Sequence, residues 1–150
     1  MAKDLDEIIY EAITANETVM TLTSGRIYST CIEVPPTEDD NTPLPYVIIT
    51  DDPYQNDLST KDAVWEGNWD RVQSSVIIVS TSPAEVKQLR RLIRQAIASY
   101  VISMTKNVPY LISASNEGIN WDWMRPCYYD TLHYQCDMAN ENDDNGQEES

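Results

Sequence analysis

The sequence contains few of the residues from which most catalytic and metal sites are built. One histidine, three cysteines and four glycines occur among its 150 residues. A single imidazole excludes a histidine-rich metal site, and no two cysteines have the CxxC spacing of a zinc ribbon. A glycine-rich phosphate loop, a GxSxG motif and an HExxH motif are also missing. We therefore expect no catalytic residues, no metal and no cofactor, and hence a protein that is not an enzyme.

Long apolar runs and basic residues are scarce as well. The longest apolar run is four residues, whereas a membrane-spanning helix needs roughly 20, and the chain starts with the polar sequence MAKDLDE. Neither a membrane span nor a signal peptide is expected. Ten lysines and arginines stand against 25 acids, which gives a net charge of -15. Because phosphate binding requires a basic surface, specific binding to nucleic acid is not expected.

Residues 82–104 show the strongest pattern in the chain. Ser82, Pro83 and Glu85 have the order of a helix start: a hydroxyl cap, a proline at the first helical position and a carboxylate three residues after the cap. Apolar residues then recur at intervals of three and four, which predicts one apolar face over about six turns. These residues are Val86, Leu89, Ile93, Ala96, Ile97, Tyr100, Val101 and Met104.

The remaining patterns predict a two-layer α+β domain over residues 1–138. A second helix is expected over 4–16, where Asp4 and Glu7 have capping-box spacing. Strands are expected at 26–28, 46–50, 72–81, 110–114 and 127–138, with an exposed loop at 33–45, an arm or long hairpin at 51–70 and an acidic disordered tail at 139–150. We expect an antiparallel sheet of four to five strands with both helices packed on one face.

Lysines and arginines gather on the long helix. Lys87, Arg90, Arg91 and Arg94 are four of the ten bases, and they project beside the predicted apolar face. One interpretation is a charged helix face balanced by nearby acids. The other is a subunit interface, in which these side chains meet an acidic loop of a neighbouring copy.

Aromatic residues in polar segments are a second candidate for partner contacts. Tyr54, Trp65 and Trp69 lie in the predicted arm, where they either fold back onto the core or contact a partner. A different class of function, a small ligand-binding or enzymatic domain, would use a pocket formed by the aromatic residues near the last strand. That pocket would contain Tyr110, Trp121, Trp123, Tyr128 and His133.

His133 is the one candidate base for such a pocket. The alternation of the last strand predicts that His133 is exposed and that Cys136 lies on the opposite face. The two side chains would then be unable to act as a nucleophile and its base. A third interpretation is a regulatory adaptor that binds one partner through its acidic tail.

The order of several short motifs resembles the tail-terminator (tail-completion) proteins of long-tailed phages and prophages, the group related to minor tail protein U. The resemblance covers roughly residues 5–138. Its motifs are GRIY at 25–28, LPYVII at 44–49, RVQ at 71–73 and SPAE at 82–85, before the long helix. The predicted arm, the acidic tail and the basic residues of the long helix depart from the family pattern.

The resemblance implies a small α+β subunit that closes into a six-membered ring. Such a ring caps the finished tail tube, stops its elongation and joins the tail to the head-side connector. The implied partners are other copies of the chain, the tail-tube protein and the connector, while DNA passes through the lumen without specific binding. The protein would be made in the bacterial host cytoplasm and end in the virion. A head-closure or neck protein of similar fold is the related alternative.

Overall fold

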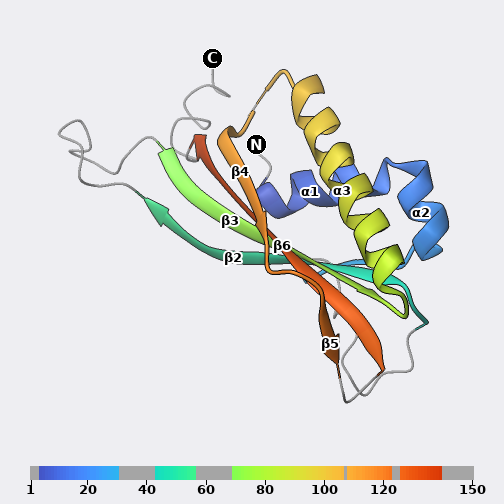
Figure 1. Ribbon diagram of the computed structural model, residues 1–150. Helices are drawn as coiled ribbons and strands as arrows, with labels where there is room; N and C mark the ends of the chain where they lie inside the picture. The colour runs from blue at the N-terminus through green and yellow to red at the C-terminus, as the bar shows by residue number, and fades with distance from the viewer. Residues whose placement is uncertain (1–3, 31–42, 57–68, 107, 123–125, 140–150) are drawn as a thin grey trace.

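The computed structural model describes residues 4–30, 43–56, 69–106, 108–122 and 126–139 (Figure 1). Along the chain, the elements are α1 (Leu5–Thr14), α2 (Glu17–Thr23), β1 (Ile27–Ser29), β2 (Tyr46–Asn56), β3 (Trp69–Ser80), α3 (Pro83–Ser103), β4 (Tyr110–Asn116), β5 (Asn120–Asp122) and β6 (Cys127–Ala139). The helices cover one face of a mixed sheet with the strand order β1-β2-β3-β6-β4, and β5 pairs with β6. The predicted α+β class is therefore confirmed.

The sheet differs from the prediction in strand number and in one strand direction. It has six strands among the described residues, and β1 runs parallel to β2, with Ile27 opposite Val47. The other pairs are antiparallel. β1 was predicted at 26–28, but its three residues give no signal of strand direction. β5 was not predicted, because its three residues are too few for an alternating pattern to show.

A third helix, α2, was not predicted. The side chain of Asn16 caps it by accepting a hydrogen bond of 3.0 Å from the amide of Val19. The helix ends where Ser24 and Gly25 adopt positive φ angles of 53° and 76°. Four of its seven residues are β-branched, which gives a weak helical signal. Complete burial of Val19 against the core stabilises α2 instead.

The segment 51–70 begins and ends inside strands, which confirms that β2 and β3 form a long antiparallel hairpin. We expected β2 to end at residue 50, before Asp51, Asp52 and Pro53, and this boundary was wrong. The pairing continues to Asn56 through a shift of register between Asp52 and Gln55. An irregularity of this kind accommodates a proline that cannot donate a backbone hydrogen bond.

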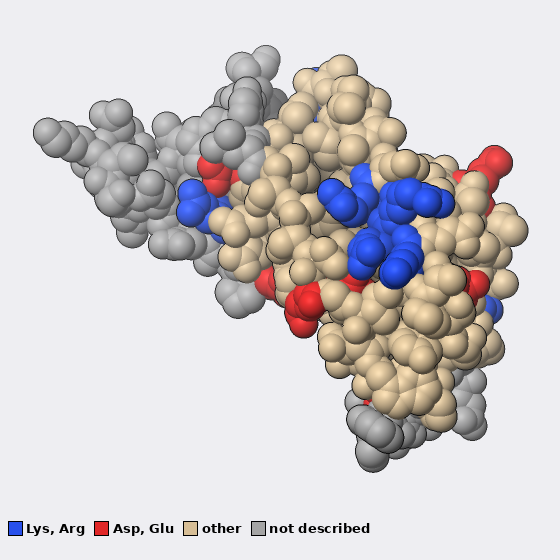
Figure 2. All heavy atoms as spheres, in the orientation of Figure 1, with Lys and Arg blue, Asp and Glu red and all other residues tan. Residues whose placement is uncertain are grey.

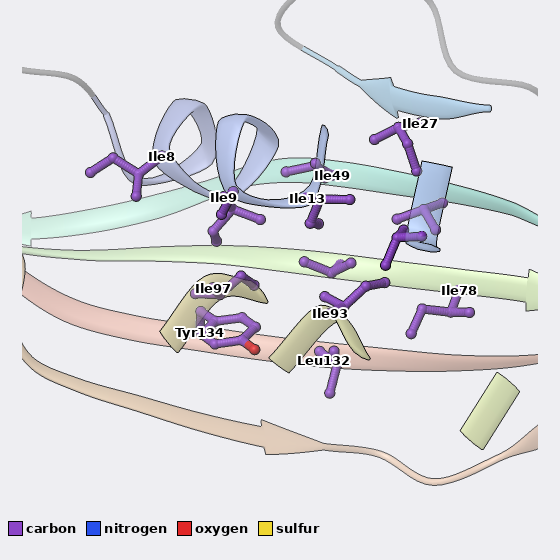
Figure 3. Close-up of a cluster of buried hydrophobic side chains, with 14 of the residues drawn as sticks. Ile8, Ile9, Ile13, Ile27, Ile49, Ile78, Ile93, Ile97, Leu132 and Tyr134 are labelled. Atoms are coloured by element: carbon purple, nitrogen blue, oxygen red, sulfur yellow. The ribbon is translucent and has the colours of Figure 1, made fainter. Parts of the chain in front are cut away.

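The core lies between the helices and the sheet (Figure 3). Ser82 caps α3 by accepting a hydrogen bond of 3.4 Å from the amide of Glu85, as predicted. The predicted capping box of α1 is not formed, because the side chain of Asp4 makes no cap hydrogen bond. The buried residues of α3 are Val86, Leu89, Ile93, Ala96 and Ile97, all from the predicted apolar face, while Tyr100, Val101 and Met104 pack at its rim.

Some sequence predictions lie outside the described residues. They are the acidic tail at 140–150, most of the loop at 33–45, and the aromatic residues Trp65 and Trp123. Among the described helices, none is long and apolar enough to span a membrane.

Candidate interaction surface

The first half of α3 carries Lys87, Arg90, Arg91 and Arg94, which we call the basic cluster. Figure 2 shows them as one blue patch, and together with Gln95 and Ala98 they line an open hollow of about 570 Å³. Residues spaced by three and four positions are neighbours on a helix, so their positive charges repel one another. The helix places the predicted side chains on one surface, and this surface suits a negatively charged partner.

Arg90 differs from the rest of the basic cluster because it has a partner inside the chain. Its Nη1 lies 2.7 Å from Oδ2 of Asp130, a β6 residue whose side chain is fully buried. Asn116 and the amide of Gly118 each donate a further hydrogen bond of 3.0 Å to Asp130. The balanced-charge interpretation is therefore right for Arg90. Lys87, Arg91 and Arg94 are exposed and pair with no acid among the residues that the structure describes.

The start of α1 and the middle of β2 carry Asp4, Asp6 and Asp51, which we call the acidic cluster. Asp6 is only 2% exposed, and its Oδ1 has no hydrogen-bond partner among the described residues. Burial and the charge of Asp6 raise the pKa of Asp4. Burial, followed by the charges of Asp6, Asp4 and Asp52, raises the pKa of Asp51. The start of α1 and the middle of β2 thus bring together carboxylates that repel one another.

Replacing Asp51 by asparagine is expected to stabilise the isolated chain at neutral pH. A carboxyl with a raised pKa binds its proton more tightly when folded, so its ionised form opposes folding at pH values above its folded pKa. The variant loses this repulsion. Urea unfolding should show the gain at neutral pH and no gain well below pH 3.8, the ordinary pKa of the group. An equal gain at both pH values would contradict the repulsion.

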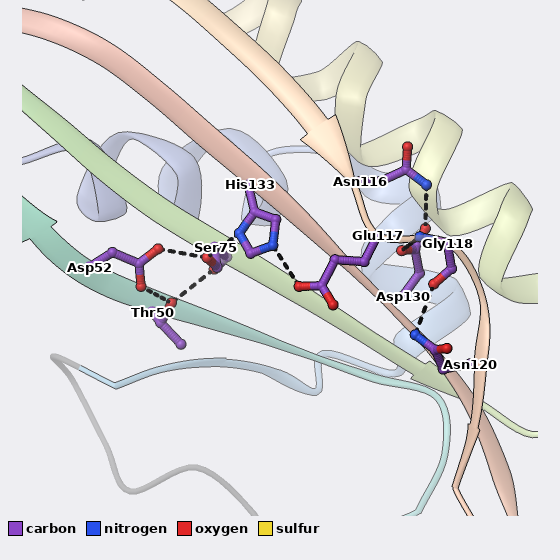
Figure 4. A network of polar contacts seen from close by, with 9 residues as sticks. All are labelled: Thr50, Asp52, Ser75, Asn116, Glu117, Gly118, Asn120, Asp130 and His133. Atoms are coloured by element: carbon purple, nitrogen blue, oxygen red, sulfur yellow. Dashed lines mark hydrogen bonds and ion pairs between the residues drawn. The ribbon is translucent and has the colours of Figure 1, made fainter.

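A separate polar network lies on the sheet face that the helices leave uncovered (Figure 4). Ser75 Oγ donates to Asp52 Oδ2 at 2.6 Å and lies 3.0 Å from Nδ1 of His133. Nε2 of His133 lies 2.6 Å from Oε2 of Glu117. Each ring nitrogen of His133 thus has one polar partner, and the tautomer decides which of the two contacts the imidazole donates. Ser75 is 6% exposed, so the network holds its hydroxyl away from solvent.

The predicted positions of His133 and Cys136 are confirmed. The side chain of His133 is 45% exposed, whereas Cys136 is buried on the other face, where burial raises the pKa of its thiol to about 12. His133 lines a hollow of about 280 Å³ with Asp52 and Gln73. Trp121 and Tyr128 do not line that hollow, and they pack against each other with ring centroids 4.7 Å apart. The structure does not bring these aromatic rings and His133 into one pocket.

For the aromatic residues of the predicted arm, contact with a partner stays a prediction. Trp65 lies outside the described residues, and Tyr54 and Trp69 are described by backbone only, in β2 and β3. In the described part of the chain, no group of three or more His, Cys, Asp or Glu residues is arranged to hold a metal ion.

Comparison with known proteins gives a match at the level of the fold. No protein-family model and no curated protein matches the sequence. The fold is similar to that of a chain in a solved structure described as the virion of a native gene transfer agent particle. The match has a TM-score of 0.53 and 14% sequence identity, and it covers 91% of this chain and 95% of that one. The two chains therefore share an architecture over nearly their whole lengths.

Proposed function

We propose that this chain is a structural protein of a phage-like virion that closes into a ring on the tail tube, stops tail elongation and joins the tail to the head connector. The similarity of fold to a virion chain over 91% of the sequence carries the proposal. The resemblance of the ordered motifs to tail-terminator proteins supports the particular role at the end of the tube. The ring is most simply six-membered, as in that family.

The mechanism follows from closure of the ring and from charge. A closed ring has no free subunit edge, so a ring bound to the tube end removes the surface on which the next tube subunit would add. A net charge of -15 repels the phosphates of DNA that passes through the lumen. In this proposal, Lys87, Arg91 and Arg94 contact the neighbouring copy, and the predicted arm contacts an adjacent ring. The protein acts by shape and charge, without a catalytic step.

The proposal predicts that the chain limits tube length. Purified tail-tube protein from the same particle is assembled with and without this chain, and tube lengths are measured by negative-stain electron microscopy. We expect short tubes with a ring at one end in the presence of the chain, because a capped end cannot grow. Tubes of equal length in both samples would contradict the proposed function.

A charge-reversed variant, Lys87→Glu with Arg91→Glu, tests the role of the basic cluster in the same assay. Both residues are exposed and neither pairs with a described acid, so the fold should tolerate the change. We expect longer tubes and a lower solution mass by light scattering. The matched control is Lys106→Glu, an exposed lysine outside the cluster, which should behave like the unaltered chain.

A further inference from the structure

Two strand edges of the sheet have no partner strand among the residues that the structure describes. The pairing of β2 with β1 ends at Ile49, whose carbonyl accepts a hydrogen bond of 3.0 Å from the amide of Thr30. Beyond that point, no described strand pairs with the outer side of β2, and none pairs with the outer side of β4. Backbone N–H and C=O groups on such edges are a template for another strand. The open segments, Thr50–Asn56 and Tyr110–Asn116, have seven residues each.

The register of the sheet puts both open segments at the same position along the strand direction. Thr50 lies opposite Ser75, Ser75 opposite His133, and His133 opposite Ser115. A second row across the same strands consists of Gln55, Arg71, Asp137 and Tyr110. The open part of β2 and the whole of β4 are thus opposite edges of one band of the sheet.

Strand directions make these edges compatible. β2, β3, β6 and β4 follow one another across the sheet, and each is antiparallel to the next, so β4 runs opposite to β2. Consider a second copy beside the first, in the same orientation and not shifted along the strands. The β4 strand of one copy then lies next to the β2 strand of the other, and the two strands are antiparallel. The helices of both copies then lie on the same face of one continuous sheet.

The charges on the helix face match the same placement. Asp51 belongs to the row that contains Ser74, Tyr134 and Ala114. Arg94 lies close enough to Tyr134 for its charge to act on that hydroxyl, opposing the burial that raises the pKa of Tyr134 to about 12.

Arg90, one helical turn before Arg94, contacts Asp130 in β6 at 2.7 Å. Asn116 at the end of β4 donates a hydrogen bond to the same carboxylate. The basic cluster therefore lies over β6 next to β4, with Arg94 near the row in which a neighbour would present Asp51.

We propose that copies of this chain join edge to edge: β4 of one copy adds to Thr50–Asn56 of the next, and Arg94 pairs with the neighbour's Asp51. This inference rests on the proposed function and names the two surfaces that close the ring. The contact is head to tail, so it repeats around a closed ring when the rotation between copies permits. Pro53 and the irregularity beside it limit non-specific pairing of the open edge.

An intermolecular disulfide tests the pairing. The double variant Thr50→Cys with Ser115→Cys puts two thiols on the uncovered face, in one row of the sheet. Within one copy they lie three strand spacings apart, about 14 Å, too far for a disulfide, which needs Cα atoms within roughly 7 Å. Any bond formed between these two positions therefore joins two copies. The matched control, Thr50→Cys with Ala114→Cys, points its thiols to opposite faces.

Mild oxidation with diamide, followed by non-reducing electrophoresis, gives the readout, with the unaltered chain as the control for its own cysteines. We expect a ladder of multimers for the first variant and none for the control variant. Equal ladders, or no ladder at the highest soluble concentration, would overturn the edge pairing. Suppose that electrophoresis shows no ladder, while light scattering still shows a ring or the chain still limits tube length. In that case the proposed function survives and only the contact between β4 and β2 is wrong.

Exchange of charges tests the ion pair across the same contact. Arg94→Asp and Asp51→Arg should each lower the solution mass, because each variant brings two like charges together. The double variant restores the opposite charges and should recover the mass of the unaltered chain. A double variant as dissociated as the single variants would overturn the assignment of Arg94 to Asp51.

Discussion

Replacing Arg90 by alanine is expected to lower the free energy of unfolding by about 3 kcal/mol, because it leaves a buried charge without its cation. Asp130 is 0% exposed and lies 2.7 Å from the guanidinium of Arg90. The hydrogen bonds from Asn116 and Gly118 remain in the variant, which puts the expected loss at the lower end for a broken buried pair. Urea unfolding at neutral pH measures the change.

Arg91→Ala is the matched control for this prediction. Arg91 is the next residue on the same helix and carries the same charge, but it is exposed. Its removal should change the unfolding free energy by less than about 0.5 kcal/mol. If the two variants lose equal stability, the contact between Arg90 and Asp130 has no special role in the fold.

Replacing Ile93 by alanine should cost about 2 to 5 kcal/mol, since it removes buried methyl groups and leaves a cavity. Ile93 is 0% exposed and lies in the core between α3 and the sheet. A typical domain has a total stability of about 5 to 15 kcal/mol, so the loss is a large fraction of the whole. Thermal and urea unfolding both report it.

Ile102→Ala provides the same chemical change at the other end of the helix. Ile102 is 84% exposed, so its replacement creates no cavity and should change stability by less than about 0.5 kcal/mol. A large effect at Ile102 in the isolated chain would show that the apolar face of α3 is assigned to the wrong residues.

The elements that the sequence predicted well are those with local signals. The apolar period of α3 repeats over about six turns. The signal for its start, which consists of Ser82, Pro83 and Glu85, lies within four consecutive residues. The elements that were missed depend on distant partners. The three residues of β5 form a strand by pairing with β6, and α2 is stabilised by the burial of Val19, so neither has a pattern of its own. β1 was predicted, but its parallel direction depends on β2.

The same distinction applies to the candidate surface. The basic cluster was predictable because its residues lie within eight positions of one helix. Asp130, its internal partner, is 40 residues from Arg90. The one available signal was its place in the alternation of β6, two residues before the buried Leu132. The acidic cluster joins α1 to a part of β2 that we expected to belong to the arm or long hairpin at 51–70, so only the fold reveals that Asp4 and Asp51 are close.

The position of β6 has a consequence for the order of events in the cell. β6 is the last strand along the described chain, yet it lies between β3 and β4, with Ser75 and His133 separated by 58 residues. A growing chain therefore has no place for β4 until synthesis passes residue 139. A chain that ends before β6 lacks the strand that joins β3 to β4, so we expect it to be unable to form the two edges of the proposed contact.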